Sequence, residues 1–287
     1  MSKKFLIPMV CFSFFTSCGQ QEETTKTKSF NQSFTADFVA RHGMSEASYQ
    51  RNFDRFTREG FKLRNISAYS EAGKPRFAAT WDKSRDGAIV AKHGMSGSQY
   101  QREFNRLTDE GYRLTDISGY EDQGKIRFAA KWTKKSGPGW RAHHNLSKAA
   151  FWQKVGEYQR QGFKVANISA YNIGQRVYFA AIWEKARDTA QYIELELNFV
   201  EAAERYQTPG YHVVDMSGYQ GNGASAFDRN QIVMVLDRGE KEQEIYLTQD
   251  PQSYQRTFRR MELEGKKPVH VAGYELDRET RYLSIFE

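Results

Sequence analysis

Apolar residues beyond residue 35 recur at helical spacing between well-placed helix ends. Between Ser45 and Gly60 they stand at Tyr49, Phe53 and Phe56, the spacing of one apolar helix face. Ser45 is a suitable N-cap, and Gly60 is suitable as the residue that follows the helix C-terminus. The sequence therefore predicts a helix here that covers an apolar surface.

Strand-like alternation precedes and follows this helix. After it, the alternation of Phe61 and Leu63 slips in phase before Ile66, which predicts a bulge or bend in that strand. A turn at Gly73 and a further alternating run that ends at Trp81 predict a hairpin. Each unit is therefore expected to contain a strand, a helix and two more strands.

The same pattern occurs five times. Three columns of residues repeat at intervals of 51, 51, 48 and 55 residues. They are Tyr69, Tyr120, Tyr171, Tyr219 and Tyr274; Gly60, Gly111, Gly162, Gly210 and Gly265; and Tyr49, Tyr100, Phe151, Phe199 and Tyr254. Identical intervals in independent columns predict five copies of one unit. The residue before each column tyrosine is alanine or glycine, which predicts the close approach of a neighbouring ring or backbone.

We predict an α+β fold of five tandem strand–helix–strand–strand repeats of about 51 residues, stacked on one another. A unit of this size cannot bury both its helix and its sheet residues alone. An open, curved array is favoured, because no overlap in sequence joins the first and last units; a propeller-like ring is the alternative. The tyrosine column and the column of Trp81, Trp132 and Trp183 are expected to form the core between units.

The predicted organisation has seven parts. They are a lipoprotein signal peptide at 1–17, a lipidated cysteine and flexible tether at 18–34, and repeats at 35–84, 85–136, 137–186, 187–240 and 241–287. The last two repeats are degenerate. The fourth carries an insertion after Tyr219, and the fifth is expected to cap the array.

The N-terminus has the features of an export signal. A short basic start is followed by an apolar run from Phe5 to Phe15, which is too short for a permanent transmembrane helix. The small residues before Cys18 resemble the lipobox of bacterial lipoproteins. The resemblance implies that Cys18 is lipidated and becomes the first mature residue; an ordinary secretory signal or a buried strand is the alternative. Gly19, where aspartate would retain a lipoprotein at the inner membrane, favours the outer membrane in a host with two membranes.

Charge and cysteine content narrow the function classes. The formal net charge is +7, but cleavage before Cys18 would remove Lys3 and Lys4, and an exported chain does not meet chromosomal DNA. We therefore expect no nucleic-acid partner. The two cysteines are Cys11 and Cys18, so the repeats hold no disulfide, zinc–thiolate site or cysteine nucleophile.

The repeats resemble a known bacterial tandem-repeat domain, which also forms the N-terminal part of polyglycine hydrolases. The resemblance rests on His-Gly-Met-Ser at 42–45 and 93–96, Asn-Ile-Ser-Ala-Tyr at 65–69, and Arg-Phe-Ala-Ala-X-Trp at 76–81 and 127–132. In polyglycine hydrolases such repeats precede a β-lactamase-like serine hydrolase domain that carries the catalysis. No Ser-x-x-Lys motif occurs, and the sequence ends on the last strand of unit five. We therefore expect no enzyme activity and no catalytic residues.

Two further columns are candidate ligand-binding residues. His42, His93 and His144 stand in register before the helix cap, where they could form a metal or anion ladder. The favoured alternative is imidazoles that bond nearby backbone, because equivalent atoms of successive units lie too far apart to converge on zinc. Tyr192 and Leu247 are expected in the same place in units four and five.

The second column is Arg76, Arg127 and Arg281, which could bind carboxylate or glycan groups. Solvated or paired charges are the favoured alternative. No metal or cofactor is expected.

The function that follows is a lipid-anchored, non-catalytic repeat protein of the bacterial cell envelope that binds a peptide, protein or glycan. The alternatives are an accessory substrate-recognition unit for a separate β-lactamase-like serine hydrolase and, less favoured, an unrecognised hydrolase that uses a histidine between units.

Overall fold

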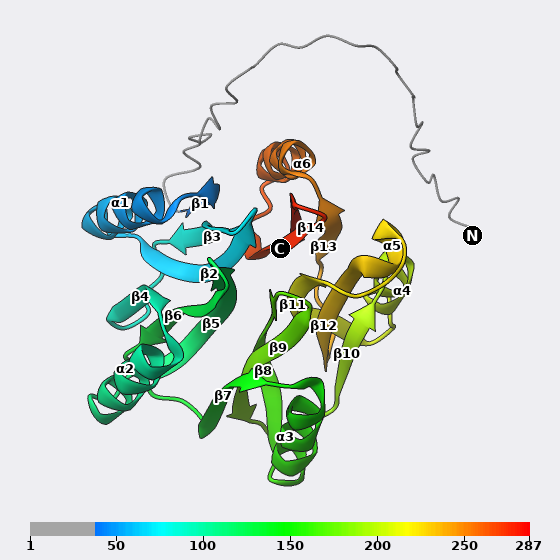
Figure 1. The fold of residues 1–287 in the computed structure, drawn as a ribbon. Coiled ribbons are helices and arrows are strands. Elements are labelled where there is room, and N and C mark those ends of the chain that lie inside the picture. The colour runs from blue at the N-terminus through cyan, green and yellow to red at the C-terminus, as the bar shows by residue number, and fades with distance from the viewer. Residues whose placement is uncertain (1–37) are drawn as a thin grey trace.

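The computed structural model describes residues 38–287, and they form five units of one strand, one helix and two strands (Figure 1). Unit one contains β1 (Phe38–Met44), α1 (Glu46–Arg58), β2 (Lys62–Glu71) and β3 (Lys74–Asp82). Unit two contains β4 (Ile89–Met95), α2 (Gly97–Asp109), β5 (Arg113–Asp122) and β6 (Lys125–Thr133). Unit three contains β7 (Trp140–Leu146), α3 (Lys148–Arg160), β8 (Phe163–Ile173) and β9 (Arg176–Lys185).

Units four and five keep this order with local changes. Unit four contains β10 (Gln191–Leu197), the short α4 (Phe199–Arg205), β11 (Tyr211–Gln220) and β12 (Asn230–Arg238). Its predicted insertion holds a one-turn helix, α5 (Ala226–Arg229). Unit five contains β13 (Glu244–Gln249), α6 (Pro251–Leu263), β14 (Pro268–Leu276) and β15 (Glu279–Phe286). Within residues 38–287, no helix combines the length and apolar character needed to span a bilayer.

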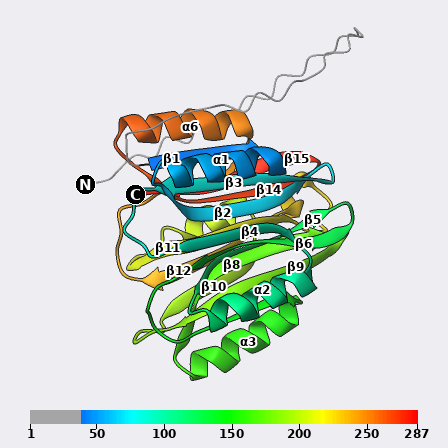
Figure 2. The ribbon, with the colours of Figure 1, turned by 90° about the vertical axis from the view of Figure 1, so that its left-hand side faces the viewer.

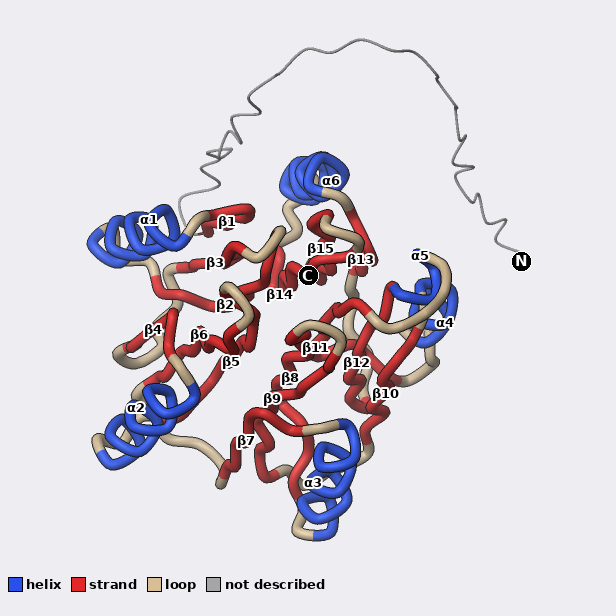
Figure 3. Tube along the Cα trace, viewed as in Figure 1, coloured by secondary structure: helices blue, strands red, loops and turns tan. Residues whose placement is uncertain are grey.

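The N-cap predicted at Ser45 is confirmed, and unit two has a serine cap in the same place. The Ser45 side chain accepts a hydrogen bond from the Ser48 backbone N–H, and Ser96 forms a full capping box with Gln99. Tyr49 and Phe56 bury the apolar face of α1. The helices lie at the periphery and the strands inside (Figures 2 and 3).

Each unit forms a three-stranded antiparallel sheet in which the third strand pairs with both others. The second strand is therefore one edge of the sheet, and this edge faces the axis of the molecule (Figure 3). The predicted bulge is confirmed, because the pairing of β2 with β3 shifts register between Leu63 and Asn65. A second shift, which the sequence did not predict, occurs in β1 at Gly43, whose φ is +61°.

The five repeats are confirmed, and they close into a ring. Strand β14 of unit five lies against β2 of unit one, as β2 lies against β5 and each inner strand against the next. The Tyr69 hydroxyl lies 2.7 Å from the Tyr282 hydroxyl across this contact. The propeller-like alternative therefore replaces the favoured open array. The ring closes because Asn65, Ser67 and Tyr69 of unit one contact unit five. The equivalent residues of unit two contact unit one in the same way.

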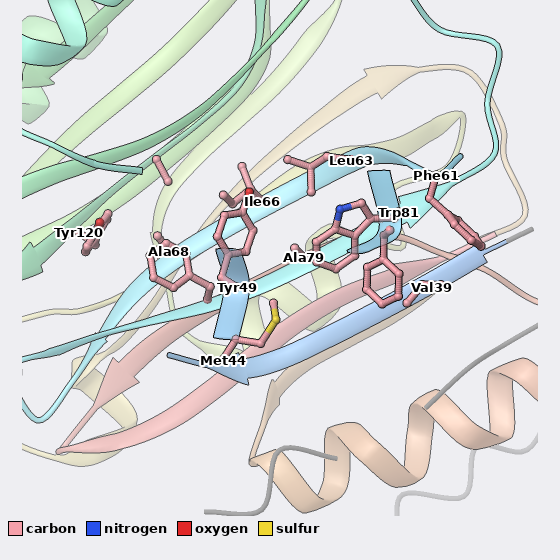
Figure 4. Packing of buried hydrophobic residues seen from close by; sticks show 13 residues of the cluster. Val39, Met44, Tyr49, Phe61, Leu63, Ile66, Ala68, Ala79, Trp81 and Tyr120 are labelled. Atoms are coloured by element: carbon pink, nitrogen blue, oxygen red, sulfur yellow. The ribbon is translucent and has the colours of Figure 1, made fainter. Parts of the chain in front are cut away.

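Each unit has its own apolar core, which the column tyrosine of the next unit completes. Figure 4 shows the core of unit one, where Trp81 lies near Tyr49 and Tyr120 enters from unit two. In the same way Tyr171, Tyr219, Tyr274 and Tyr69 enter units two, three, four and five. The tyrosine column is core between units, as predicted. The same prediction was wrong for the tryptophan column. Each tryptophan lies on the central strand of its sheet and packs under the helix of its own unit.

Candidate functional site

Polar side chains on the inner strands join neighbouring units. The inner strand is a sheet edge, and its unpaired N–H groups require acceptors. In unit one, the N–H of Ile66 donates to Asp116 Oδ2 at 2.8 Å, and the N–H of Ala68 donates to Ser118 Oγ at 2.9 Å. Side chains of the next unit thus cap the edge, where a strand would do so in a continuous sheet.

The same two bonds recur at three further contacts between units, which we call seams. The donor and acceptor pairs are Ile117 to Asn167, Gly119 to Ser169, Ile168 to Asp215, Ala170 to Ser217, Val271 to Asn65, and Gly273 to Ser67. The seam between units four and five lacks them, because His270 and Ala272 occupy the two positions.

The first of these positions forms a polar ring around the axis, which we call the axial belt. Its members are Asn65, Asp116, Asn167, Asp215 and His270. The Asn167 amide donates to Asp116 at 3.2 Å and to Asp215 at 2.9 Å, so amides separate the two carboxylates. Burial raises the pKa of both Asp116 and Asp215. The buried Lys131 ammonium lies near Asp116 and donates to the Arg64 carbonyl.

Small residues next to the tyrosine column allow the units to approach. A Cβ added to Gly119 would lie 2.3 Å from the Tyr171 ring, and one added to Gly273 would lie 2.3 Å from the Tyr69 ring. This confirms the predicted close approach. The Ile-Ser-Gly/Ala-Tyr motif is thus explained by assembly of the ring.

One end of the axis holds a cavity of about 700 Å³, lined by residues of all five inner strands. It begins at the serines that cap the edges (Ser67, Ser118, Ser169 and Ser217) and opens between the hairpin turns. Its volume lies within the usual range of ligand pockets. The lining is mainly hydroxyl, amide and backbone groups, which favour a ligand that forms hydrogen bonds.

Carboxylates stand at the mouth of this axial cavity. Glu121 accepts a hydrogen bond from the Gly174 N–H at 3.0 Å, and Glu275 accepts one from the Ala72 N–H. Both bonds cross seams, so they also hold the hairpin turns together. Burial raises the pKa of Glu275, with smaller contributions from the charges of Glu121 and Glu71.

The histidine column lies at three separate seams on the outer side of the ring. His42 lies 3.0 Å from Gln255 Oε1 and packs edge-on against Tyr254 and Tyr282 of unit five. His93 contacts Glu46 and Gln50 of α1. Each histidine therefore bonds or packs against the preceding unit, and the structure does not bring the three together.

His144 packs in the same way on Tyr100 and Phe128, and burial lowers its pKa and that of His42. Leu195 and Leu247 occupy this position in units four and five, since each precedes a residue with positive φ, as His42 precedes Gly43. The prediction of Tyr192 was therefore wrong by three residues, and Leu247 was correctly placed. Leucine at the same position packs against the preceding unit, which indicates a packing position.

The arginine column is paired within its own hairpins. Arg76 donates to Glu71 at 2.7 Å, Arg127 lies 3.7 Å from Asp122, and Arg281 donates to Glu279 at 2.6 Å. None of the three lines the axial cavity.

The remaining predicted site residue is Cys18, which lies outside the described residues, as do the signal peptide and the whole tether. In the part of the chain that the structure describes, no group of three or more histidine, cysteine or carboxylate side chains could hold a metal ion.

Sequence reasoning missed the axial belt and the cavity. The belt is a sequence column, and the available signal was a polar residue four positions before the column tyrosine in each predicted strand. Its members are Asn65, Asp116, Asn167, Asp215 and His270. The cavity had no such signal, because it exists only once the ring is closed.

A family model of the polyglycine hydrolase-like structural repeat matches residues 35–84, 86–135, 137–186 and 242–287. These matches cover more than half of the chain, so the chain belongs to this repeat family.

Proposed function

We propose that this chain is a lipid-anchored, non-catalytic repeat protein of the bacterial cell envelope. In this proposal Cys18 carries the lipid, and the ring binds an extracytoplasmic peptide, protein or glycan. The sequence around Cys18 supports the anchor, and the axial cavity supports the binding role.

The observation that carries the binding proposal is the axial cavity. Five units contribute equivalent lining residues to it, and it opens between hairpin turns. Its walls offer serine hydroxyls and side-chain amides such as Asn172 and Gln220, together with the carboxylates of Glu121 and Glu275. A polar ligand segment that enters along the axis would meet hydrogen-bonding groups from several units at once.

The test compares two tryptophan variants of the same hairpin. Ser70 lines the cavity, whereas Lys74 is exposed on the same hairpin and does not line it. Surface plasmon resonance against fractionated envelope peptides, proteins and glycans should identify a ligand for the wild type. We expect Ser70→Trp to weaken that ligand at least tenfold and Lys74→Trp to leave it unchanged. Equal binding by wild type and Ser70→Trp would refute the axial cavity as the binding site.

The anchor has its own test. Mass spectrometry of the protein from membranes should find a lipidated Cys18 as the first residue, and Cys18→Ala should release the protein from the membrane fraction. An unmodified Cys18 in membrane-derived protein would contradict the anchor without affecting the cavity proposal.

A second function is favoured by the family match: the ring could recognise substrate for a separate β-lactamase-like serine hydrolase. Co-purification with such a hydrolase, and faster cleavage of its substrate when the ring is added, would distinguish this function from a stand-alone binding protein. Hydrolysis by the purified ring alone, lost in His93→Ala, would instead support the hydrolase alternative.

A further inference from the structure

The seam between units four and five is built unlike the other four. In place of an asparagine or aspartate it has His270, and in place of the serine it has Ala272. Asp215 Oδ1 accepts from the backbone N–H of Met216, within its own unit. His270 Nε2 lies 2.8 Å from the Met216 carbonyl oxygen, so the histidine bonds the edge of unit four through its C=O.

Both ring nitrogens of His270 face oxygen atoms. Nε2 faces the Met216 carbonyl, and Nδ1 lies 3.2 Å from Asp215 Oδ1. A carbonyl only accepts hydrogen bonds, so Nε2 must carry a hydrogen. A proton is then needed between Nδ1 and Asp215 as well, because a bare lone pair would otherwise face a carboxylate. It can reside on either group, as imidazolium with carboxylate or as imidazole with carboxylic acid.

We infer that one proton shared by His270 and Asp215 latches the four–five seam, so that ring closure depends on pH. This inference rests on the seam alone and holds whether or not the axial cavity binds a ligand. The pair is shielded from solvent, because the His270 side chain is only 12% exposed and the Asp215 side chain only 3%.

The charged groups around the pair are one further member of the axial belt and two basic side chains beside it. Asp116 on β5 lies close enough to influence both members of the pair, and Lys131 on β6 lies beside Asp116. Arg64 on β2 forms ion pairs with Asp82 and Asp86, and its charge acts on Lys131. Burial lowers the pKa of His270 and raises that of Asp215, and both shifts favour the neutral pair with its proton on Asp215.

The direction of the pH dependence follows from counting protons. An opened seam returns the two groups to their ordinary pKa values of 6.5 and 3.8. Between these values the opened pair also holds one proton, so opening releases none. Above pH 6.5 the opened pair holds none and opening releases one proton, so the opening equilibrium rises up to tenfold per pH unit. Below pH 3.8 the opened pair takes up a second proton, and acid again favours opening.

The decisive variant makes this seam like the others. His270→Asn with Ala272→Ser restores the residues of unit one at both positions, and neither new side chain titrates. The matched control is His144→Asn, which removes a partly buried histidine at the two–three seam that contacts aromatic rings.

The experiment is amide hydrogen exchange of the full chain from pH 5.5 to 8.5, corrected for intrinsic rates. In the wild type and in His144→Asn, amides of β11 and β14 at the seam should lose protection up to tenfold per pH unit above pH 6.5. In the double variant this loss should disappear. A wild-type seam with pH-independent protection, or a double variant with the wild-type slope, would overturn the inference.

A second measurement does not depend on any variant. The ¹⁵N shifts of His270 in the wild type at pH 7 should show a hydrogen on Nε2, with Nδ1 either protonated or hydrogen-bonded to an acid. An Nδ1 free of any hydrogen bond would contradict the shared proton.

Discussion

The seam between units one and two and the seam between units four and five differ in their polar contacts and agree in their apolar ones. At the first, Asp116 and Ser118 cap the edge N–H groups of Ile66 and Ala68. At the second, His270 reaches a carbonyl, and Ala272 offers no hydroxyl.

The apolar contact is nevertheless the same. Tyr120 is 2% exposed in the core of unit one, and Tyr274 is 3% exposed in the core of unit four. The comparison indicates that tyrosine packing assembles the ring, while the belt and serine bonds adjust how firmly each seam closes.

The largest expected effect tests the shared part of this comparison. Tyr120→Ala and Tyr274→Ala each remove a buried ring that completes a neighbouring core, so each should lower the free energy of unfolding by about 3–5 kcal/mol. Urea denaturation would measure both. Tyr192→Ala, at a tyrosine that is 40% exposed, should cost about 1 kcal/mol or less. A cost that small for Tyr274→Ala alone would mean that packing differs between the seams.

The next effect tests the part that differs. Ser118→Ala leaves the buried N–H of Ala68 without its acceptor and should cost about 1–3 kcal/mol. Ala272→Ser introduces the missing hydroxyl at the four–five seam and should gain about 0.5–1.5 kcal/mol. Thermal unfolding of the two variants measures whether each substitution lowers or raises the stability. Destabilisation by Ala272→Ser would show that this seam has adapted to lack a serine.

The smallest effect concerns an ion pair at the four–five seam, between the insertion of unit four and the hairpin turn of unit five. Arg229 donates to both Asp277 carboxylate oxygens, at 2.9 and 2.7 Å, while both side chains remain partly exposed. A double-mutant cycle with Arg229→Ala and Asp277→Ala should give a coupling of about 0.2–1 kcal/mol that shrinks at high salt. A coupling of several kcal/mol, insensitive to salt, would make this pair the main bond of the seam.

The unit and its repetition could be predicted because the evidence is local. The cap at Ser45, the bulge after Leu63 and the close approach at the small residue before each column tyrosine could all be predicted from neighbouring residues. Closure could not be read in the same way, since it depends on the rotation between successive units. No residue reports that angle.

The candidate site shows the same limit. His42 and His93 are candidate ligand-binding residues by sequence because histidine is chemically versatile. In the structure, Leu195 and Leu247 occupy the equivalent position in units four and five. His270 is not a candidate by sequence, because it lies in the degenerate unit five, where the axial-belt column is hardest to align. Its partner Asp215 is 55 residues earlier, and only the stacking of unit five on unit four places them side by side.

The central claim is that five units form a closed ring, and the amides of Val271 and Gly273 test it most directly. In the ring, Asn65 and Ser67 of unit one accept hydrogen bonds from these N–H groups, each at 3.0 Å. In an open array they would be a free sheet edge. Hydrogen exchange should find them as protected as the equivalent amides of Ile66 and Ala68. Exchange of both at the rate of an unpaired edge, while Ile66 and Ala68 stay protected, would contradict the closed ring.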